Sequence, residues 1–369
     1  MTRISENKIK VLVAPLDWGL GHTTRCIPII YELISLDVEV ILAGNDTQRA
    51  LLQREFPDCK FLRLEGYNIS YSSTRSDFVL KVLQQVPSML KTIRAENNWL
   101  DKTIEEYKID AVISDNRFGL HTKKVPCIFI THQLLIKNDL GKIAERTIQR
   151  FNYQQINHFT KCWIPDFEND PNLAGALSHP EKMPSIPCEY IGFLTRIKRV
   201  EVQKIKGHIL IMISGPEPQR TLFEKIIFEQ LQSFNGTATV VRGKPADTVP
   251  PPLINGVAVF NHLAKEDLNK ELCRAEFVVC RTGYSSVMDI AGLDVKPILV
   301  PTPGQTEQEY LAKYLSKQNF CITSTQQNFN LKLLLQKAQK FQFENPFRQK
   351  KYNLSEIVKV FVREMISKT

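Results

Sequence analysis

The sequence predicts an α/β protein built from two doubly wound, Rossmann-like domains that face a cleft. Two observations support this prediction: short apolar runs alternate with helix-length segments in the first half of the chain, and the alternation starts again after residue 207. Buried runs of this kind are typical of parallel strands covered by helices on both faces. The 369 residues suffice for two domains, and contents of 43% apolar and 24% charged residues are usual for a globular protein.

The expected strands follow one another with helices between them. In the first half they cover residues 10–16, 38–43, 111–114 and 127–131, and in the second half residues 208–213, 238–242, 257–260, 277–280 and 298–300. The expected helices cover residues 22–35, the stretch after Asn45-Asp46 up to Glu55, residues 78–107 with an interruption at Pro87, residues 221–232 and, last, residues 354–366. The charged segment 192–207 separates the two patterns, so we expect domains at residues 1–195 and 196–369.

The net charge of +9 and the pI of about 9.0 narrow the choice of partners. This excess suits nucleic acid, an anionic membrane or a phosphorylated substrate, but the sequence contains no basic tail or nucleic-acid-binding module. We therefore expect no nucleic-acid partner. The eight cysteines stand singly, without a Cys-x-x-Cys pair, which predicts reduced thiols and no zinc site. A polar N-terminus and the lack of a bilayer-length apolar run favour a cytoplasmic location.

Peripheral contact with a membrane stays open. Lys81, Lys91 and Arg94 stand near apolar positions of the expected third helix, as in helices that bind anionic surfaces. The same pattern is typical of an ordinary amphipathic helix packed on a core, which is the favoured interpretation.

The segment from Asp17 to Arg25 joins the first expected strand to the first helix and contains a candidate catalytic residue. Gly19 and Gly21 allow the backbone to approach a ligand closely, and His22 is expected near the helix N-terminus, where the helix dipole favours the neutral imidazole. A neutral histidine at a ligand-binding edge can act as a general base toward an attacking hydroxyl. The alternative is a structural histidine after a glycine turn.

Asp115 is the candidate partner of this histidine. It follows the strand at residues 111–114, so it is expected at the same edge of the sheet as His22, where it could hold the second imidazole nitrogen. The alternative is an Asx turn or helix cap formed with Asn116. His132 follows a further strand and is a weaker candidate, for which a structural role is favoured.

The second half of the chain carries a pattern that suits a nucleotide diphosphate. The run at residues 277–280 ends at Arg281-Thr-Gly, and a helix-like segment follows and reaches Asp289. The run at residues 298–300 ends in a Pro/Gly loop before Glu307-Gln308. Amides at a helix N-terminus can bind phosphate, and a nearby carboxylate can accept ribose hydroxyls. Taken singly, the acids at 289 and 307 also suit a solvated helix surface.

The turn after residues 208–213 is a weaker phosphate site. Ser214 and Gly215 offer a hydroxyl and an amide, and Arg220 could add positive charge. The two prolines of the turn remove donors, and Glu217 repels anions. The predicted donor-binding residues are Gly21, Ser214, Gly215, Arg220, Arg281, Thr282, Gly283, Asp289, Glu307 and Gln308.

Together, these motifs resemble the inverting glycosyltransferases of the two-Rossmann (GT-B) fold, above all the family-28 group of the UDP-N-acetylglucosamine transferases of peptidoglycan precursor synthesis and, more distantly, plant-type UDP-glycosyltransferases. Gly19-Leu-Gly-His22 resembles the Gly-x-Gly-His loop of that family. Of the family's Ser-Gly-Gly-Ser turn, this sequence keeps only Ser214-Gly215. Arg281-Thr-Gly283 resembles its Arg-Ser-Gly turn, and Asp289 stands where a glutamate usually binds the uridine ribose. Glu307-Gln308 resembles the pair that contacts the donor sugar.

The resemblance implies a nucleotide-sugar donor, UDP-linked (for example UDP-N-acetylglucosamine), held mainly by the C-terminal domain. It implies a sugar, lipid-linked or small-molecule acceptor in the N-terminal domain, and a final helix that crosses back over that domain. Transfer would proceed with inversion and without a metal or other cofactor, with His22 taking the acceptor proton and Asp115 orienting it. Two alternatives stay open: an enzyme like the nucleotide-sugar 2-epimerases, and a non-catalytic nucleotide-sugar-binding subunit.

Overall fold

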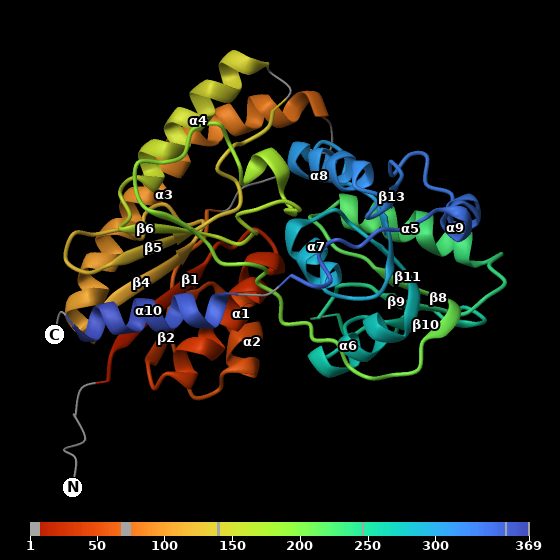
Figure 1. Cartoon of the computed structure of the whole chain (residues 1–369), viewed down its shortest axis with the longest axis horizontal. Helices are drawn as coiled ribbons and strands as arrows, with labels where there is room; N and C mark the ends of the chain where they lie inside the picture. The colour runs from red at the N-terminus through yellow and green to blue at the C-terminus, as the bar shows by residue number, and fades with distance from the viewer. Residues whose placement is uncertain (1–7, 68–74, 139–140, 246, 351–352, 368–369) are drawn as a thin grey trace, which may run out of the picture. The chain divides into compact units, whose positions relative to one another are not determined.

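The computed structural model describes residues 8–67, 75–138, 141–245, 247–350 and 353–367. The chain divides into two compact units. The first consists of the described residues within Met1–Ser70, Val82–Thr195 and Lys351–Thr369, and the second contains Arg196–Lys350. Figure 1 shows a sheet flanked by helices in each of them.

The first unit is built on a seven-stranded parallel sheet in the order β3-β2-β1-β4-β5-β6-β7. Its strands are β1 (Lys10–Pro15), β2 (Glu39–Gly44), β3 (Lys60–Arg63), β4 (Ala111–Asp115), β5 (Cys127–Ile130), β6 (Lys161–Ile164) and β7 (Cys188–Tyr190). The helices are α1 (Leu20–Ser35), α2 (Asp46–Glu55), the greater part of α3 (Arg75–Tyr107), α4 (Lys142–Ile156), the 3-10 turn η1 (Gly175–Leu177) and α10 (Leu354–Ile366). Every residue of β4 and β5 is buried, as expected for central strands covered on both faces.

The last helix of the chain, α10, belongs to the first unit and packs against α1. One face of α10 is apolar and buried, and on this face the ring of Phe361 lies 5.4 Å from that of Trp163 on β6. Trp163 is fully buried and donates its indole N–H to Glu189 Oε2 at 3.0 Å. The first unit is therefore completed by a helix that follows all strands of the second sheet in the sequence.

The second unit contains a six-stranded parallel sheet in the order β10-β9-β8-β11-β12-β13. Its strands are β8 (Ile205–Met212), β9 (Ala238–Val241), β10 (Val257–Phe260), β11 (Ala275–Cys280), β12 (Lys296–Leu299) and β13 (Ile322–Thr323). The helices are α5 (Gln219–Leu231), α6 (Lys265–Arg274), α7 (Tyr284–Ala291), α8 (Thr306–Lys317) and α9 (Leu331–Lys340). An apolar core of buried aliphatic and aromatic side chains holds the sheet to α5 and α9.

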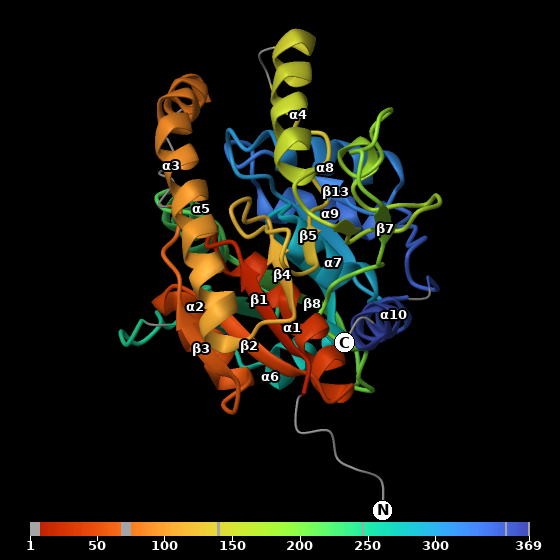
Figure 2. The same ribbon diagram turned by 90° about the vertical axis from the view of Figure 1, so that its left-hand side faces the viewer.

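Both sheets reverse their strand order beside their first strand. In the first sheet the reversal lies between β1 and β4, with Pro15 beside Asp115, and Figure 2 shows these two strands next to each other. In the second sheet it lies between β8 and β11, with Met212 beside Cys280. In doubly wound sheets, ligands bind at the carboxyl ends of the strands at this position.

The expected strands and helices are present, with ends that differ by up to three residues, but one expectation is wrong. The predicted interruption at Pro87 is absent, because α3 continues through this residue. A proline removes one helical hydrogen bond, and here packing of the later turns, including fully buried Leu100, holds the helix to the core. Among the described helices, none combines the length and apolar character needed to cross a membrane.

Candidate active site and donor-binding loops

His22 lies at the reversal point of the first sheet. The loop after β1 is tied to β4 by the bond from Leu16 N to the Asp115 carbonyl, at 2.9 Å. Gly19 precedes α1 with φ of 73°, a conformation that glycine adopts without strain. The helix begins at Leu20, so His22 is in its first turn. Its Nδ1 lies 3.1 Å from Asp115 Oδ1, its side chain is 16% exposed, and its Nε2 has no hydrogen-bond partner among the described residues.

Asp115 is fully buried and is held by four groups. Besides His22, it accepts hydrogen bonds from Arg25 Nε at 2.6 Å, from Arg25 Nη2 and, at 3.6 Å, from the thiol of Cys26. Burial alone would raise the pKa of Asp115, but the charges and hydrogen bonds of Arg25 and His22 outweigh it and hold this pKa well below its usual range. Asp115 is therefore ionised at neutral pH and can accept the Nδ1 proton of His22.

Arg25 is a site residue that the sequence reasoning missed. Its guanidinium is 2% exposed, and its Nη1 lies 3.3 Å from Nδ1 of His132. A guanidinium can only donate, so Nδ1 of His132 is the acceptor. His132 is 3% exposed and contacts the guanidinium of Arg25. The spacing of three residues between His22 and Arg25 was the available signal, because side chains at i and i+3 share a face of a helix.

A second buried pair supports the end of β1. Arg117 is fully buried and donates to Glu96 Oε1 at 2.7 Å and to the carbonyl oxygens of Pro15 and Glu65. Glu96 also accepts from the hydroxyl of Tyr67 at 2.7 Å, and its burial raises the pKa of its carboxyl. These bonds fix the strand that leads into the His22 loop.

In the second unit, Arg281 ties together three segments at the reversal point. Its Nη2 donates to the Gln219 carbonyl at 2.9 Å and to Gln326 Oε1 at 2.5 Å, and its Nη1 donates to the carbonyl of Val300 at 3.4 Å. The guanidinium lies 4.2 Å from the centre of the Phe223 ring. Burial lowers the pKa of Arg281 to about 10, so its charge remains at neutral pH. The described contacts make Arg281 an organiser of the loops after β11 and β12.

Two threonines beside Arg281 have unused hydrogen-bonding groups. The hydroxyl oxygens of Thr282 and Thr302 are buried and have no hydrogen-bond partner among the described residues. Gly215, with φ of 111°, is so close that an added Cβ would lie 3.6 Å from Thr302 Oγ1. Native structures contain few such unsatisfied groups, and a functional role is one of the explanations for those that occur.

Three more of the predicted donor-binding residues, Gly283, Gln308 and Ser214, lie in the same group of loops. Gly283 is the N-cap of α7, and a Cβ added to it would lie 4.0 Å from Gln308 Nε2. The Gln308 side chain accepts from Thr302 N at 2.9 Å, and Ser214 precedes Gly215 in the turn that follows β8. The loops after β8, β11 and β12 are thus brought together at one edge of the sheet.

Three predicted residues lie at the margins of this group. Asp289 is on α7 and partly buried. The pKa of Cys280 is raised to about 12, first by burial of the thiol and second by the negative charge of Asp289. Glu307 is in the first turn of α8. Arg220 donates to Glu217 and Glu224, each at 2.6 Å, so its charge is already shared with two carboxylates. Gly21, also predicted to bind the donor, precedes His22 in the first unit.

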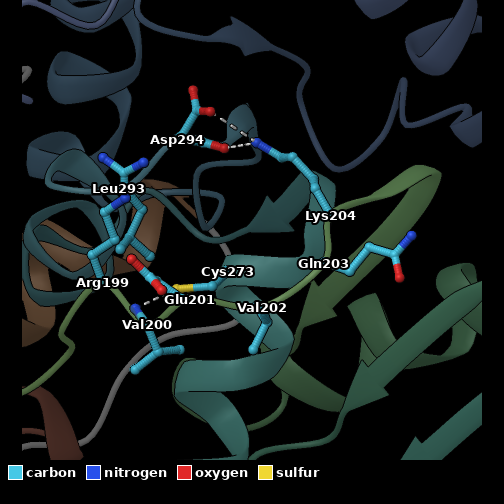
Figure 3. Close-up of a pocket in the computed structure, with 9 residues that line it drawn as sticks. All are labelled: Arg199, Val200, Glu201, Val202, Gln203, Lys204, Cys273, Leu293 and Asp294. Atoms are coloured by element: carbon cyan, nitrogen blue, oxygen red, sulfur yellow. Dashed lines mark hydrogen bonds and ion pairs between the residues drawn. The ribbon is translucent and has the colours of Figure 1, made fainter.

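One pocket of the second unit lies away from all of these residues (Figure 3). It is lined by residues 199–204 together with Cys273, Leu293 and Asp294. These segments precede β8, β11 and β12, so the pocket belongs to the amino-terminal edge of the sheet. Lys204 bridges part of it by binding the carbonyl and, at 3.4 Å, the carboxylate of Asp294.

The described residues contain no group of three or more His, Cys, Asp and Glu side chains that could hold a metal ion. On α3, Lys91 and Arg94 are exposed and Leu90 is 36% exposed, while Ile93 packs with Leu16 and Tyr67. This is an amphipathic helix with its apolar side on the core. The side chain of Lys81 lies outside the described residues.

Comparison with known proteins identifies the class of the chain. Residues 261–365 match the glycosyltransferase family 28 C-terminal domain, a span that contains Arg281, Asp289 and Gln308. An uncharacterized glycosyltransferase of Methanosarcina acetivorans is 22% identical over 349 residues, which cover 85% of this chain and 84% of the relative. Another, from Methanosarcina mazei, is 20% identical with the same coverage.

Solved structures agree in fold over nearly the whole chain. The glycosyltransferase SnogD from Streptomyces nogalater superposes with a TM-score of 0.63 at 13% identity, over 97% of this chain and 100% of SnogD. MurG of Acinetobacter baumannii gives a TM-score of 0.59 at 14% identity, over 97% and 100% of the two chains. The predicted GT-B fold and the resemblance to family-28 glycosyltransferases are confirmed. The prediction of an enzyme of the glycosyltransferase class is confirmed with them.

Proposed function

We propose that the protein transfers a sugar, with inversion and without a metal ion, from a UDP-linked donor to the hydroxyl group of an acceptor. The observation that carries the proposal is the His22–Asp115 pair: a buried, ionised carboxylate holds Nδ1 of a partly exposed imidazole whose Nε2 has no partner among the described residues. A carboxylate in this position selects the tautomer with a basic Nε2. Nε2 is then the atom that receives a proton.

The donor diphosphate is assigned to the second unit, at the N-terminus of α7. The free N–H groups of the first helical turn bind anions. The buried hydroxyls of Thr282 and Thr302 supply two further donors, and the absence of a Cβ at Gly215 and Gly283 leaves room for phosphate oxygens. Asp289 would accept the ribose hydroxyls, and Gln308 with Glu307 would contact the sugar.

In the proposed reaction, the acceptor O–H bond breaks as its proton moves to Nε2 of His22. The acceptor oxygen attacks the anomeric carbon, and the bond from that carbon to the phosphate oxygen breaks with its electron pair. A single displacement of this kind inverts the anomeric configuration. The leaving diphosphate gains negative charge, which the N-terminus of α7 and the two threonine hydroxyls would stabilise.

The proposed acceptor belongs to one of three classes: a sugar, a lipid-linked molecule or a small molecule. A lipid-linked acceptor would require peripheral contact with a membrane, for which Lys91, Arg94 and Lys102 are exposed basic residues of α3. Sedimentation with anionic vesicles at low and high salt distinguishes this class, because electrostatic binding is lost at high salt.

The test is turnover with UDP-sugars in EDTA, across an acceptor panel that represents the three classes, with the anomeric configuration of the product read by NMR. The proposal expects an inverted glycoside from the wild-type protein and, for His22→Ala, a rate lower by on the order of 10²–10⁴. An epimerised sugar formed without acceptor would instead identify a 2-epimerase-like enzyme. Binding of UDP without turnover on any acceptor would favour a non-catalytic subunit.

A further inference from the structure

Trp18 is an exposed aromatic residue in the turn that leads to the proposed base. Of the three tryptophans of the chain, Trp163 is fully buried and Trp99 packs, partly buried, against the core of the first unit, whereas Trp18 is 39% exposed. Trp18 directly precedes Gly19, the N-cap of α1, and His22 follows in the first turn of this helix. An indole combines an apolar face with a polar N–H edge, so its exposure at this place suits a ligand that is partly apolar.

The turn that carries this tryptophan is held in place by hydrogen bonds. Leu16 N donates to the Asp115 carbonyl at 2.9 Å, and Gly19 N donates to the Asp17 carbonyl at 3.0 Å. The Asp17 carboxylate in turn accepts from Tyr67 N at 3.2 Å. A Cβ built on Gly19 would meet no described atom within 4 Å. The backbone beneath the indole is therefore fixed, while the space beside Gly19 is open.

Asn116 offers a free amide at the same reversal point of the first sheet. It directly follows Asp115, and its φ of 56° lies in the left-handed region, which asparagine adopts more readily than most residues. Its backbone N–H donates to the Ile130 carbonyl at 3.2 Å, whereas its half-buried side chain makes no hydrogen bond with any described residue. The amide thus has both donor and acceptor groups available for a ligand.

We propose that Trp18 and Asn116 form the acceptor subsite of the His22 base, and that the acceptor presents a sugar ring there. The inference rests on the proposed function and narrows its three acceptor classes to one chemistry. The two residues lie on loops that leave adjacent strands, each within two residues of the bond from Leu16 N to the Asp115 carbonyl.

The chemistry of the two side chains matches a pyranose. One face of such a ring consists of C–H groups, which pack on an indole, and its hydroxyls both donate and accept, as the amide of Asn116 does. Stacking on Trp18 fixes the plane of the ring, and the hydrogen bonds fix its rotation in that plane, so that one hydroxyl can be presented to Nε2 of His22. A flat aromatic acceptor would use the indole but not the amide, which distinguishes the two kinds of ligand.

The first experiment measures sugar binding without turnover, by tryptophan fluorescence. The probes are methyl pyranosides of several configurations, with and without an acetamido group, at millimolar concentrations. The wild-type protein should show a saturable change of emission with at least one of them, and the change should vanish in Trp18→Phe because Trp18 is the exposed indole. No saturable change with any pyranoside, or a change that persists in Trp18→Phe, overturns the proposal.

The second experiment compares variants by ligand-observed NMR with the pyranoside that binds best. Trp18→Ala and Asn116→Gly should each weaken binding on the order of tenfold, while Trp18→Phe should stay within about threefold, since a phenyl ring still stacks. Glycine tolerates the left-handed backbone at position 116, so this variant removes the amide without added strain. Wild-type affinity in folded Trp18→Ala or in folded Asn116→Gly overturns the subsite.

Two further probes identify the source of the ring. An octyl glycoside of the same sugar, below its micelle concentration, binds more tightly than the methyl glycoside if the sugar is the end of a lipid, and equally if the acceptor is a free sugar. Binding of 2-naphthol that exceeds that of every pyranoside and is unchanged in Asn116→Gly would indicate an aromatic acceptor and overturn the proposal.

Phe260→Ala and Asn319→Gly are the matched controls. Phe260 on β10 is also 39% exposed, Asn319 also has a φ of 56°, and both belong to the second unit. Neither change should alter pyranoside binding, and a loss as large as that of the Trp18 and Asn116 variants would overturn their specific role. If the wild-type protein forms no glycoside but binds pyranosides through Trp18 and Asn116, the proposed function fails and this inference holds, so the two failures are distinguishable.

Discussion

Asp115→Asn is the substitution that separates the catalytic and structural roles of the buried cluster. The carboxylate has two acceptor oxygens: Oδ1 faces His22 and Arg25, and Oδ2 faces Arg25 and Cys26. An asparagine keeps one oxygen and replaces the other by an NH2 group, which faces a donor of the Arg25 guanidinium in either orientation. When the NH2 group takes the Oδ1 position it also faces the imidazole, and it then selects the tautomer in which Nε2 carries the proton.

The magnitudes follow from burial and from this mismatch. Asp115 is fully buried and Arg25 is 2% exposed, and removal of one partner from a buried ion pair costs about 3–5 kcal/mol. Loss of the correct tautomer lowers the rate on the order of 10⁴ when the carboxylate is the orienting group of a histidine base. We therefore expect Asp115→Asn to melt at a clearly lower temperature and, below that temperature, to lose nearly all turnover.

The assay combines thermal unfolding with kcat/KM at a temperature where circular dichroism shows the variant folded. Asp166→Asn is the matched control: Asp166 is also fully buried in the first unit, where it accepts from the backbone N–H groups of Phe167, Leu173 and Ala174 and has no described contact with His22. This control should lose stability but keep its turnover. A kcat/KM for folded Asp115→Asn within threefold of wild type would refute the assignment of His22 and Asp115 as a catalytic pair.

Three further predictions follow from the same structure. Thr282→Val and Thr302→Val each remove an unpaired buried hydroxyl, so each should raise the free energy of unfolding by about 1 kcal/mol and weaken UDP binding about tenfold; lower stability with unchanged calorimetric affinity would contradict the donor assignment. The depressed pKa of Asp115 means that its stabilisation is complete above the unfolded-state value of about 4 and is lost as pH falls through the lower folded value. The stability difference between wild type and Asp115→Asn should therefore shrink below pH 4 in urea titrations, and a constant difference from pH 7 to 3 would argue against it. Phe361→Ala on α10 should cost about 3–5 kcal/mol, because the ring is 3% exposed and packs on Trp163; a loss below 1 kcal/mol would mean that α10 contributes little to the first unit.

The alternation of apolar runs and helical segments was enough to predict two parallel sheets, because this pattern is local. His22 and Asp115 could be paired from sequence because each follows a buried strand, and carboxyl ends of parallel strands share an edge. The 3.1 Å contact between them agrees with that reasoning.

Arg25 could not be recognised in the same way. A charged residue in an amphipathic helix is normally placed in solvent, and its burial here depends on the parallel pairing of β1 with β4, which brings Asp115 beneath the helix. The burial of the unpaired hydroxyls of Thr282 and Thr302 depends in the same way on the packing of two loops that follow different strands. The interruption predicted at Pro87 is absent for a related reason, since tertiary packing of α3 outweighs a local helix breaker.

Calorimetric titration with UDP, GDP and dTDP in EDTA tests most directly whether the N-terminus of α7 is a nucleotide-sugar donor site. We expect UDP to bind in preference to the other two nucleotides and Asp289→Asn to weaken UDP binding about tenfold. Asp267→Asn, which changes an exposed acid of α6 in the same unit, should leave the affinity unchanged. Equal loss of affinity in both variants, or no binding of any of the three nucleotides by the wild-type protein, would contradict this assignment.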